Sequence, residues 1–142
     1  MNKTLKFMVV DDNHTNNLLC KYIIRKYKED AEIIIFSKPE DALDFIKEDY
    51  VSKGENNFTL LFLDINMPFM TGWEFLEVFK NFSEEIHRQF VIFMLTSSVD
   101  KRDKGIAEAN PFVSGFISKP LSVDTIQQVV EDHCLMNISH KN

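Results

Sequence analysis

The chain has 142 residues, 44% of them apolar, and carries a net charge of −6 at pH 7. This is enough for one globular domain and too little for two of ordinary size, so we expect a single domain over 1–142 with its core over about 5–134. The acidic charge argues against direct nucleic-acid binding, and no apolar run approaches the roughly 20 residues that span a bilayer. No secretory signal follows Met1, so we expect a cytoplasmic protein whose Cys20 and Cys134 are reduced thiols.

Strand and helix patterns alternate from the start of the chain. Leu5–Val10 is a short apolar run that predicts a first strand. A helix is predicted next, because apolar residues recur at helical spacing at Leu18, Leu19, Tyr22, Ile23, Ile24 and Tyr27. A second strand is expected within Ala31–Phe36, and Ser37 is expected to cap a helix that has Pro39 near its first turn.

The third predicted strand, Thr59–Leu63, has no polar alternation after its first residue. This pattern is typical of a strand buried on both faces of a parallel sheet. The strand stops at Asp64, on a predicted loop. A helix is expected over 73–82, the segment 83–89 is polar and charged, and Phe90–Leu95 predicts a fourth buried strand.

The last part of the chain repeats the alternation. Asp100–Ala109 predicts a polar helix, Phe112–Ile117 a fifth strand, and Val123–Cys134 an amphipathic helix. Strands and helices that alternate in this way predict an α/β fold, with right-handed crossovers and helices on both faces of a parallel sheet. No linker rich in proline, glycine or serine divides the chain.

Four of the five predicted strands end in residues whose side chains can bind a ligand or react: Asp11 and Asp12, Asp64, Thr96, and Lys119. Parallel strands bring such ends to one edge of the sheet, where open α/β sheets bind ligands. Three carboxylates repel one another there unless a cation compensates, and oxygen ligands alone suit Mg²⁺ before Ca²⁺. A Mg²⁺ ion beside a carboxylate, a lysine and a hydroxyl suits phosphoryl transfer, with the carboxylate as nucleophile.

These segments together resemble the receiver domain of two-component response regulators, in particular single-domain regulators of the chemotaxis kind. The resemblance extends from Leu5 to about Cys134 and rests on Val9–Asn13, Leu63–Pro68 with Met70 and Gly72, Leu95–Ser98, and Ser118–Pro120. It implies a doubly wound, flavodoxin-like sheet of five parallel strands in the order 2-1-3-4-5. It also implies one receiver domain over 1–142, a signalling switch and not an enzyme beyond its own phosphotransfer and dephosphorylation.

The resemblance assigns a role to each residue at the strand ends. Asp64 would be the phosphoacceptor, which takes its phosphoryl group from a histidine kinase or a His phosphotransfer protein. Asp12 would bind Mg²⁺ directly, Asp11 would bind it through water or orient its shell, and the backbone carbonyl of Asn66 would complete the protein ligands. Lys119 would pair with Asp64 and then with the phosphoryl oxygens, and its bond to the following proline is often cis in the family.

The resemblance also implies how the signal would be read. Thr96 and Phe116 would form the conformational switch, while Asn66 and Ser98 would modulate hydrolysis of the phosphoryl group. A downstream protein would bind the face formed by the fourth predicted helix, the fifth strand and the fifth helix. That fourth helix is locally basic, with Lys101, Arg102 and Lys104.

Each assignment has a simpler alternative. Asp11 could serve only as a salt-bridge partner, Thr96 could cap the helix that follows it, and Phe116 could be a fixed core aromatic. His14, next to the acidic pair, suggests a metal ligand, but we expect it to face solvent at the start of the first helix.

Two other functions deserve comparison. A Mg²⁺-dependent phosphatase of the haloacid dehalogenase family would also use a nucleophilic aspartate, but it carries a second aspartate two residues later, where this chain has Asn66. A flavodoxin-like module could bind phosphate at Thr96–Ser98, but the acidic edge would repel an anionic cofactor. Within the receiver class, the chain is a stand-alone regulator or part of a longer protein such as a hybrid kinase, and its short ends favour the former.

Overall fold

The computed structural model describes residues 4–51, 57–97 and 100–133. Five parallel strands form one sheet in the order β2-β1-β3-β4-β5, which confirms the predicted fold class and strand order. The elements are β1 (Thr4–Val10), α1 (His14–Tyr27), β2 (Glu32–Phe36), α2 (Pro39–Asp49), β3 (Asn57–Asp64), α3 (Gly72–Phe79), α4 (Glu84–His87), β4 (Phe90–Thr96), α5 (Lys101–Ala109), β5 (Val113–Ser118) and α6 (Val123–Asp132).

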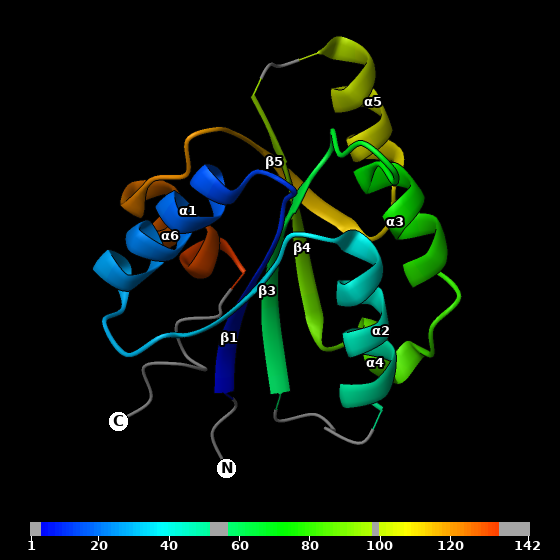
Figure 1. Cartoon of the computed structure of the whole chain (residues 1–142), viewed down its shortest axis with the longest axis horizontal. Coiled ribbons are helices and arrows are strands. Elements are labelled where there is room, and N and C mark those ends of the chain that lie inside the picture. The colour runs from blue at the N-terminus through cyan, green and yellow to red at the C-terminus, as the bar shows by residue number, and fades with distance from the viewer. Residues whose placement is uncertain (1–3, 52–56, 98–99, 134–142) are drawn as a thin grey trace.

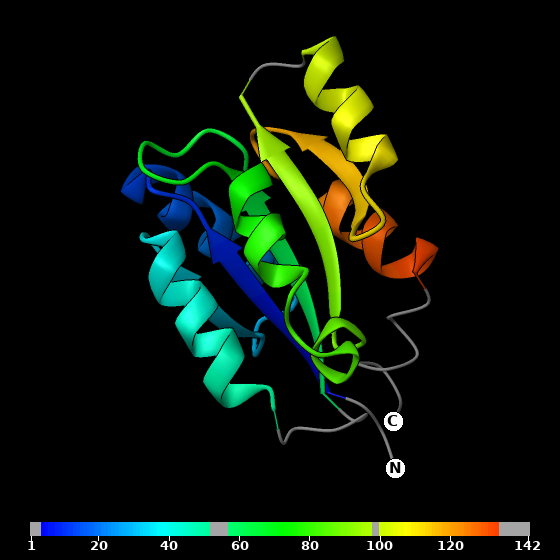
Figure 2. The ribbon, with the colours of Figure 1, turned by 90° about the vertical axis from the view of Figure 1, so that its right-hand side faces the viewer.

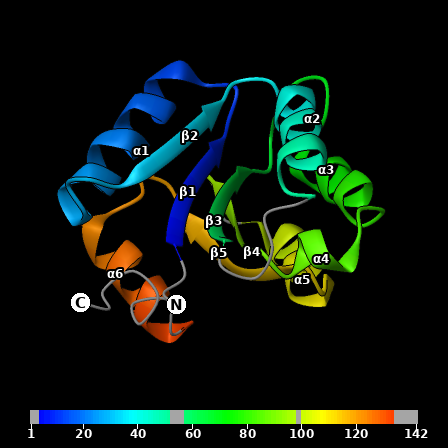
Figure 3. The ribbon, with the colours of Figure 1, turned by 90° about the horizontal axis from the view of Figure 1, so that it is seen from below.

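Helices cover both faces of the sheet (Figures 1 and 3). On one face, α1 and α6 pack on Phe7 and Val9 of β1 and on the same-facing residues of the neighbouring strands. On the other face, α2, α3 and α4 pack on Met8 and Val10 and on their neighbours. Successive side chains of a strand point to opposite faces, so a strand buried on both sides must be apolar throughout. This is why β3 could be recognised from composition alone.

The first helix is where the sequence pattern was least informative. Of the residues whose spacing predicted it, Ile24 is buried and Ile23 and Tyr27 pack against the core, but Leu18 and Tyr22 are 68% and 60% exposed. The buried stripe also carries Asn17 and Cys20. The helix begins at His14, four residues before the first apolar residue of the pattern, because Asn13 caps it by accepting a hydrogen bond from the Asn16 N–H at 2.9 Å. The predicted helix exists, and its buried face keeps Ile24 of the predicted stripe but not Leu18 or Tyr22.

One local prediction was wrong, and one short helix was not foreseen. Ser37 does not cap α2, because the N-cap is Lys38, which makes no capping bond through its side chain, with Pro39 as the first helical residue. The segment 83–89 contains the short helix α4, capped by the Ser83 hydroxyl and anchored by the buried Ile86. Cys20 is a buried free thiol, as predicted, while Cys134 lies outside the described residues.

The edge strand β5 also differs in detail from its prediction. It runs from Val113 to Ser118, and its pairing with β4 shifts register so that Val113 lies opposite Ile92 and Gly115 opposite Phe93. A Cβ atom at Gly115 would lie 2.5 Å from the Phe93 ring, which explains the glycine inside a strand. Figure 2 shows β5 at the edge of the sheet, near α5 and α6. In the described part of the chain, none of the helices combines the length and the apolar character needed to cross a membrane.

Candidate functional site

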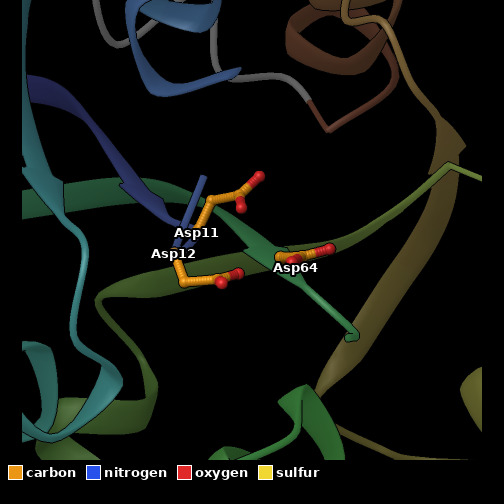
Figure 4. Close-up of side chains that lie close together, drawn as sticks. All are labelled: Asp11, Asp12 and Asp64. Carbon is orange, nitrogen blue, oxygen red and sulfur yellow. The ribbon is translucent and has the colours of Figure 1, made fainter. Parts of the chain in front are cut away.

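The carboxyl edge of the sheet holds three aspartates. Asp11 and Asp12 follow β1, Asp64 is the last residue of β3, and one carboxylate oxygen from each lies within 4.8 Å of the others (Figure 4). Asp11 and Asp64 are 0% and 4% exposed, whereas Asp12 is exposed. They line an open cavity of about 530 Å³ whose walls are mostly polar.

Lys119 enters this cluster from the loop after β5. Its Nζ lies 2.8 Å from Asp11 Oδ2 and 3.3 Å from Asp64 Oδ1, so that one ammonium group bridges the ends of β1 and β3. The Lys119 N–H donates to the carbonyl of Thr96 at 2.7 Å, and the Lys119–Pro120 peptide bond is cis. A surface lysine directed into solvent would not make these contacts.

The electrostatics of the cluster follow from burial and crowding. Burial, and then the charge of Asp11, raise the pKa of Asp64 from 3.8 to about 6, although Lys119 and a hydrogen bond with the backbone of Asn66 act in the opposite direction. Burial alone would lower the pKa of Lys119, but its hydrogen bond and charge interaction with Asp11, and then those with Asp64, outweigh burial and raise it. The site therefore carries more negative charge than one lysine compensates.

That donor set fits a hard divalent cation. The available ligands are carboxylate oxygens, with the exposed Asn66 beside them on the cavity wall and no cysteine among the lining residues. His14 lines the cavity as the first residue of α1 and is exposed, in agreement with the expected solvent-facing position. A cation among the three aspartates would relieve their mutual repulsion.

The two residues expected to act as a switch lie next to this edge. Thr96 ends β4 and is fully buried. The N-cap of α5 is Asp100, so Thr96 does not cap that helix. Phe116 pairs with Met94, two residues before Thr96, and is half-buried against the α3 side of the core. It also lines a cavity of about 400 Å³ between α5 and β5.

Gly72 and its neighbours shape the loop that carries Asp64. The Gly72 N–H donates to the carbonyl of Ile65 at 2.8 Å, and a Cβ atom at Gly72 would lie 2.7 Å from the Asp64 carbonyl oxygen. Thr71 caps α3 in a capping box with Glu74, which fixes the start of the helix at Gly72. Only glycine permits this close return of the chain.

The sequence did not single out the asparagines that surround Asp11. The Asn13 N–H donates to Asp11 Oδ1 at 2.9 Å, the Asn16 side chain donates to Asp11 Oδ2 at 2.6 Å, and the Asn17 side chain donates to the Asp11 carbonyl at 2.8 Å. The position of Asn16, five residues after Asp11, could have indicated this contact. The segment was interpreted instead as residues that cap the following helix. Ser98, expected to modulate hydrolysis, lies outside the described residues. The roles of the other residues stay predictions.

Comparisons with known proteins agree with this geometry. The family model of the response regulator receiver domain matches residues 7–131. The chain is 29% identical over 140 residues to the osmosensing histidine protein kinase SLN1 of Saccharomyces cerevisiae. The match covers 98% of this chain but only 11% of SLN1. It is 26% identical to the chemotaxis protein CheY-3 of Vibrio cholerae, with 92% of each chain covered. A crystal structure of a two component response regulator from Cytophaga hutchinsonii superposes with a TM-score of 0.82 at 28% identity, and the match covers 94% of this chain and 98% of that one.

Proposed function

Because the chain belongs to the response regulator receiver domain family, we propose that Asp64 accepts a phosphoryl group from a phosphohistidine and holds it as a signal. Receiver domains of this family are phosphorylated by histidine kinases, and a His phosphotransfer protein is the second donor that fits. The observation that carries the proposal is the placement of Lys119 Nζ between Asp11 and Asp64. The lysine that would neutralise phosphoryl oxygens is already in contact with the nucleophile.

The chemistry needs no further enzyme group. A carboxylate oxygen of Asp64 attacks the phosphorus, a new O–P bond forms, and the P–N bond to the donor imidazole breaks. The electron pair of that bond stays on the imidazole nitrogen, which takes a proton from solvent. Asp64 must be ionised to attack, and the positive charge of Lys119 favours the ionised form. Hydrolysis of the aspartyl phosphate by water then resets the protein, so both steps are self-catalysed.

Mg²⁺ is the cation that fits the oxygen ligands of this site best. Asp12 and Asp64 would hold it directly, Asp11 through water or by orienting the shell, and the Asn66 carbonyl would complete the protein ligands. When bound, Mg²⁺ neutralises the phosphoryl oxygens and the three carboxylates together. Asn66 also stands where a phosphatase of the dehalogenase type needs an acid, so the site suits a stored phosphate better than rapid turnover of phosphate esters.

The response would pass through Thr96 and Phe116. A hydrogen bond from the Thr96 hydroxyl to the phosphoryl group would draw the end of β4 toward the site and open space for Phe116 to turn inward. A phosphoryl group can shift the equilibrium between two conformations only through contacts that differ between them. We propose that a downstream protein reads the result on the face of α5, β5 and α6, where the side chains of Lys101, Arg102 and Lys104 are exposed. A cytoplasmic location and the absence of direct nucleic-acid binding stay predictions.

Phosphoryl uptake from phosphoramidate, measured by intact mass, tests the proposal. We expect one phosphoryl group per chain in the presence of Mg²⁺ and none after chelation or in Asp64→Asn. Asp44→Asn, which changes an exposed carboxylate on α2, is the matched control and should behave as the wild type. Equal uptake by Asp64→Asn and the wild type would refute Asp64 as the acceptor. Phosphotransfer from a panel of histidine kinases would then identify the donor.

A further inference from the structure

The carboxylate of Asp11 is held by more hydrogen bonds than its neighbours in the cluster. Its Oδ1 accepts from the Asn13 N–H at 2.9 Å, and its Oδ2 accepts from both the Asn16 amide at 2.6 Å and Lys119 Nζ at 2.8 Å. A carboxylate offers roughly four lone-pair sites, so these donors leave about one for a cation or its water. The orientation of Asp11 is therefore set by its hydrogen bonds.

Asn16 is itself fixed by the start of α1. Its backbone N–H donates to the Asn13 side chain at 2.9 Å, so Asp11, Asn13 and Asn16 form a closed ring of three hydrogen bonds. The side-chain orientation of Asn16 is also determined, because an ionised carboxylate only accepts and the amide nitrogen must face it. The amide approaches Cys20 Sγ at 3.6 Å on its other side.

Lys119, in contrast, is a partner that Asp11 shares with Asp64. Its Nζ contacts both Asp11 and Asp64, and under the proposed function it must turn toward the phosphoryl oxygens once Asp64 is modified. Asp11 Oδ2 would then lose one of its two donors. The Asn16 amide would remain, because it is tied to the first turn of α1 and has no contact with Asp64 among the described hydrogen bonds.

We propose that Asn16 is a positioning residue for Asp11: its amide holds the carboxylate in place for the divalent cation, and keeps it there when Lys119 moves to the phosphoryl group. The inference rests on the proposed function, because it assigns Asn16 a part in the same cation site. Hydrogen bonds to the ligands of a metal orient those ligands, and their loss typically weakens metal binding by roughly 10- to 100-fold.

Binding of Mn²⁺ to the full chain, followed by the electron paramagnetic resonance signal of the free ion, tests the inference without any phosphodonor. We expect Asn16→Ala and Asn16→Leu to weaken Mn²⁺ binding by about tenfold or more. The leucine side chain has the same number and branching of heavy atoms as asparagine but no donor, so a similar loss in both variants assigns the effect to the hydrogen bond. Asn81→Ala is the control, since Asn81 is exposed and its side chain donates to the Glu77 carbonyl at the far end of α3.

A double-mutant cycle with Lys119→Met separates positioning from a structural role. When Lys119 is absent, the Asn16 amide is the donor left on Asp11 Oδ2, so Asn16→Leu should cost more Mn²⁺ affinity in Lys119→Met than in the wild type. A merely structural asparagine would lower the unfolding temperature of the metal-free protein by the same amount in both backgrounds and leave this difference at zero.

The outcomes separate the inference from the function on which it rests. If the wild type does not bind Mn²⁺, the cation site itself and the proposed function are refuted. If the wild type binds Mn²⁺ and both Asn16 variants bind it equally well, the positioning role alone is refuted. Should Asn16→Leu fail to fold, Asn16→Ala decides, because it only removes atoms from a half-buried position on the first turn of a helix.

Discussion

Replacing Asp64 by asparagine should stabilise the metal-free protein at neutral pH. The carboxylate is 4% exposed and lies against Asp11, and the two effects raise its pKa from 3.8 to about 6. An asparagine at this position keeps the shape and removes the buried charge. The ionised form is thus destabilised in the folded protein relative to the unfolded chain, where the carboxyl group is solvated.

The size and the pH window of the effect follow from these two pKa values. One pKa unit corresponds to 1.36 kcal/mol, so a rise of about two units gives an upper limit of about 3 kcal/mol, and relaxation of the site reduces this to about 1–3 kcal/mol. Between pH 4 and pH 6 the folded protein holds a proton on Asp64 that the unfolded chain has lost, so stability falls as pH rises through this window. Above about pH 6 Asp64 is ionised in both states, and the loss of stability caused by its buried charge no longer changes with pH.

Urea unfolding in the presence of a chelator, at intervals from pH 4 to pH 8, measures the difference. We expect Asp64→Asn and the wild type to be nearly equal in stability at pH 4, and the variant to be more stable by about 1–3 kcal/mol at pH 8. The exposed Asp44→Asn should show no such pH dependence. Saturating Mg²⁺ should stabilise the wild type selectively, because a ligand that binds only the folded state adds to its stability. A difference between Asp64→Asn and the wild type that does not change from pH 4 to pH 8 would show that ionisation of Asp64 does not destabilise the folded protein.

Three further perturbations follow from single contacts. Lys119→Met removes the ammonium group that contacts Asp64 at 3.3 Å and should slow phosphoryl uptake from phosphoramidate by about 100-fold or more, measured as a rate of mass change. An unchanged rate would show that Lys119 has no part in the mechanism. Gly72→Ala would place a Cβ atom 2.7 Å from the Asp64 carbonyl and should cost about 1–3 kcal/mol in urea unfolding, whereas Gly105→Ala, which meets nothing within 4 Å, should not destabilise. Asp103→Ala removes the acceptor of the Trp73 indole N–H at 3.2 Å and should change the emission of this tryptophan, the only one in the chain, with a stability loss of about 1 kcal/mol or less; unchanged emission would show that the bond is absent in solution.

The fold could be predicted because its strands are buried on both faces. Runs such as Thr59–Leu63 and Phe90–Leu95 have no polar face, and their alternation with helices leaves few arrangements. The buried face of α1 could not be predicted in the same way. Its inward stripe contains the polar Asn17, whose amide binds the Asp11 carbonyl, while the apolar Leu18 and Tyr22 face solvent. A buried polar residue that donates to a strand end gives no signal in a hydrophobic pattern.

The residues at the strand ends were identified for a different reason: topology alone brings them together. The parallel order of the strands places Asp11, Asp64 and Lys119 on one edge whatever their side chains do. The hydrogen bond of Asn16 to Asp11 could not be predicted, because it depends on the conformation of the turn between β1 and α1. A neutral amide also gives no signal in the charge pattern of the sequence. Distances among side chains, such as the shared contact of Lys119, likewise required the packed structure.

Phosphorylation at Asp64 is tested best by locating the phosphoryl group in the sequence. The protein is treated with phosphoramidate and Mg²⁺, the acyl phosphate is reduced with borohydride, and the peptides are sequenced by mass spectrometry. Borohydride reduction converts a phosphorylated aspartate to homoserine, so the account predicts homoserine at position 64 and at no other aspartate, and none when Mg²⁺ is chelated. Homoserine at Asp11 or Asp12, or a phosphoryl group on a histidine or serine with Asp64 unmodified, would contradict it.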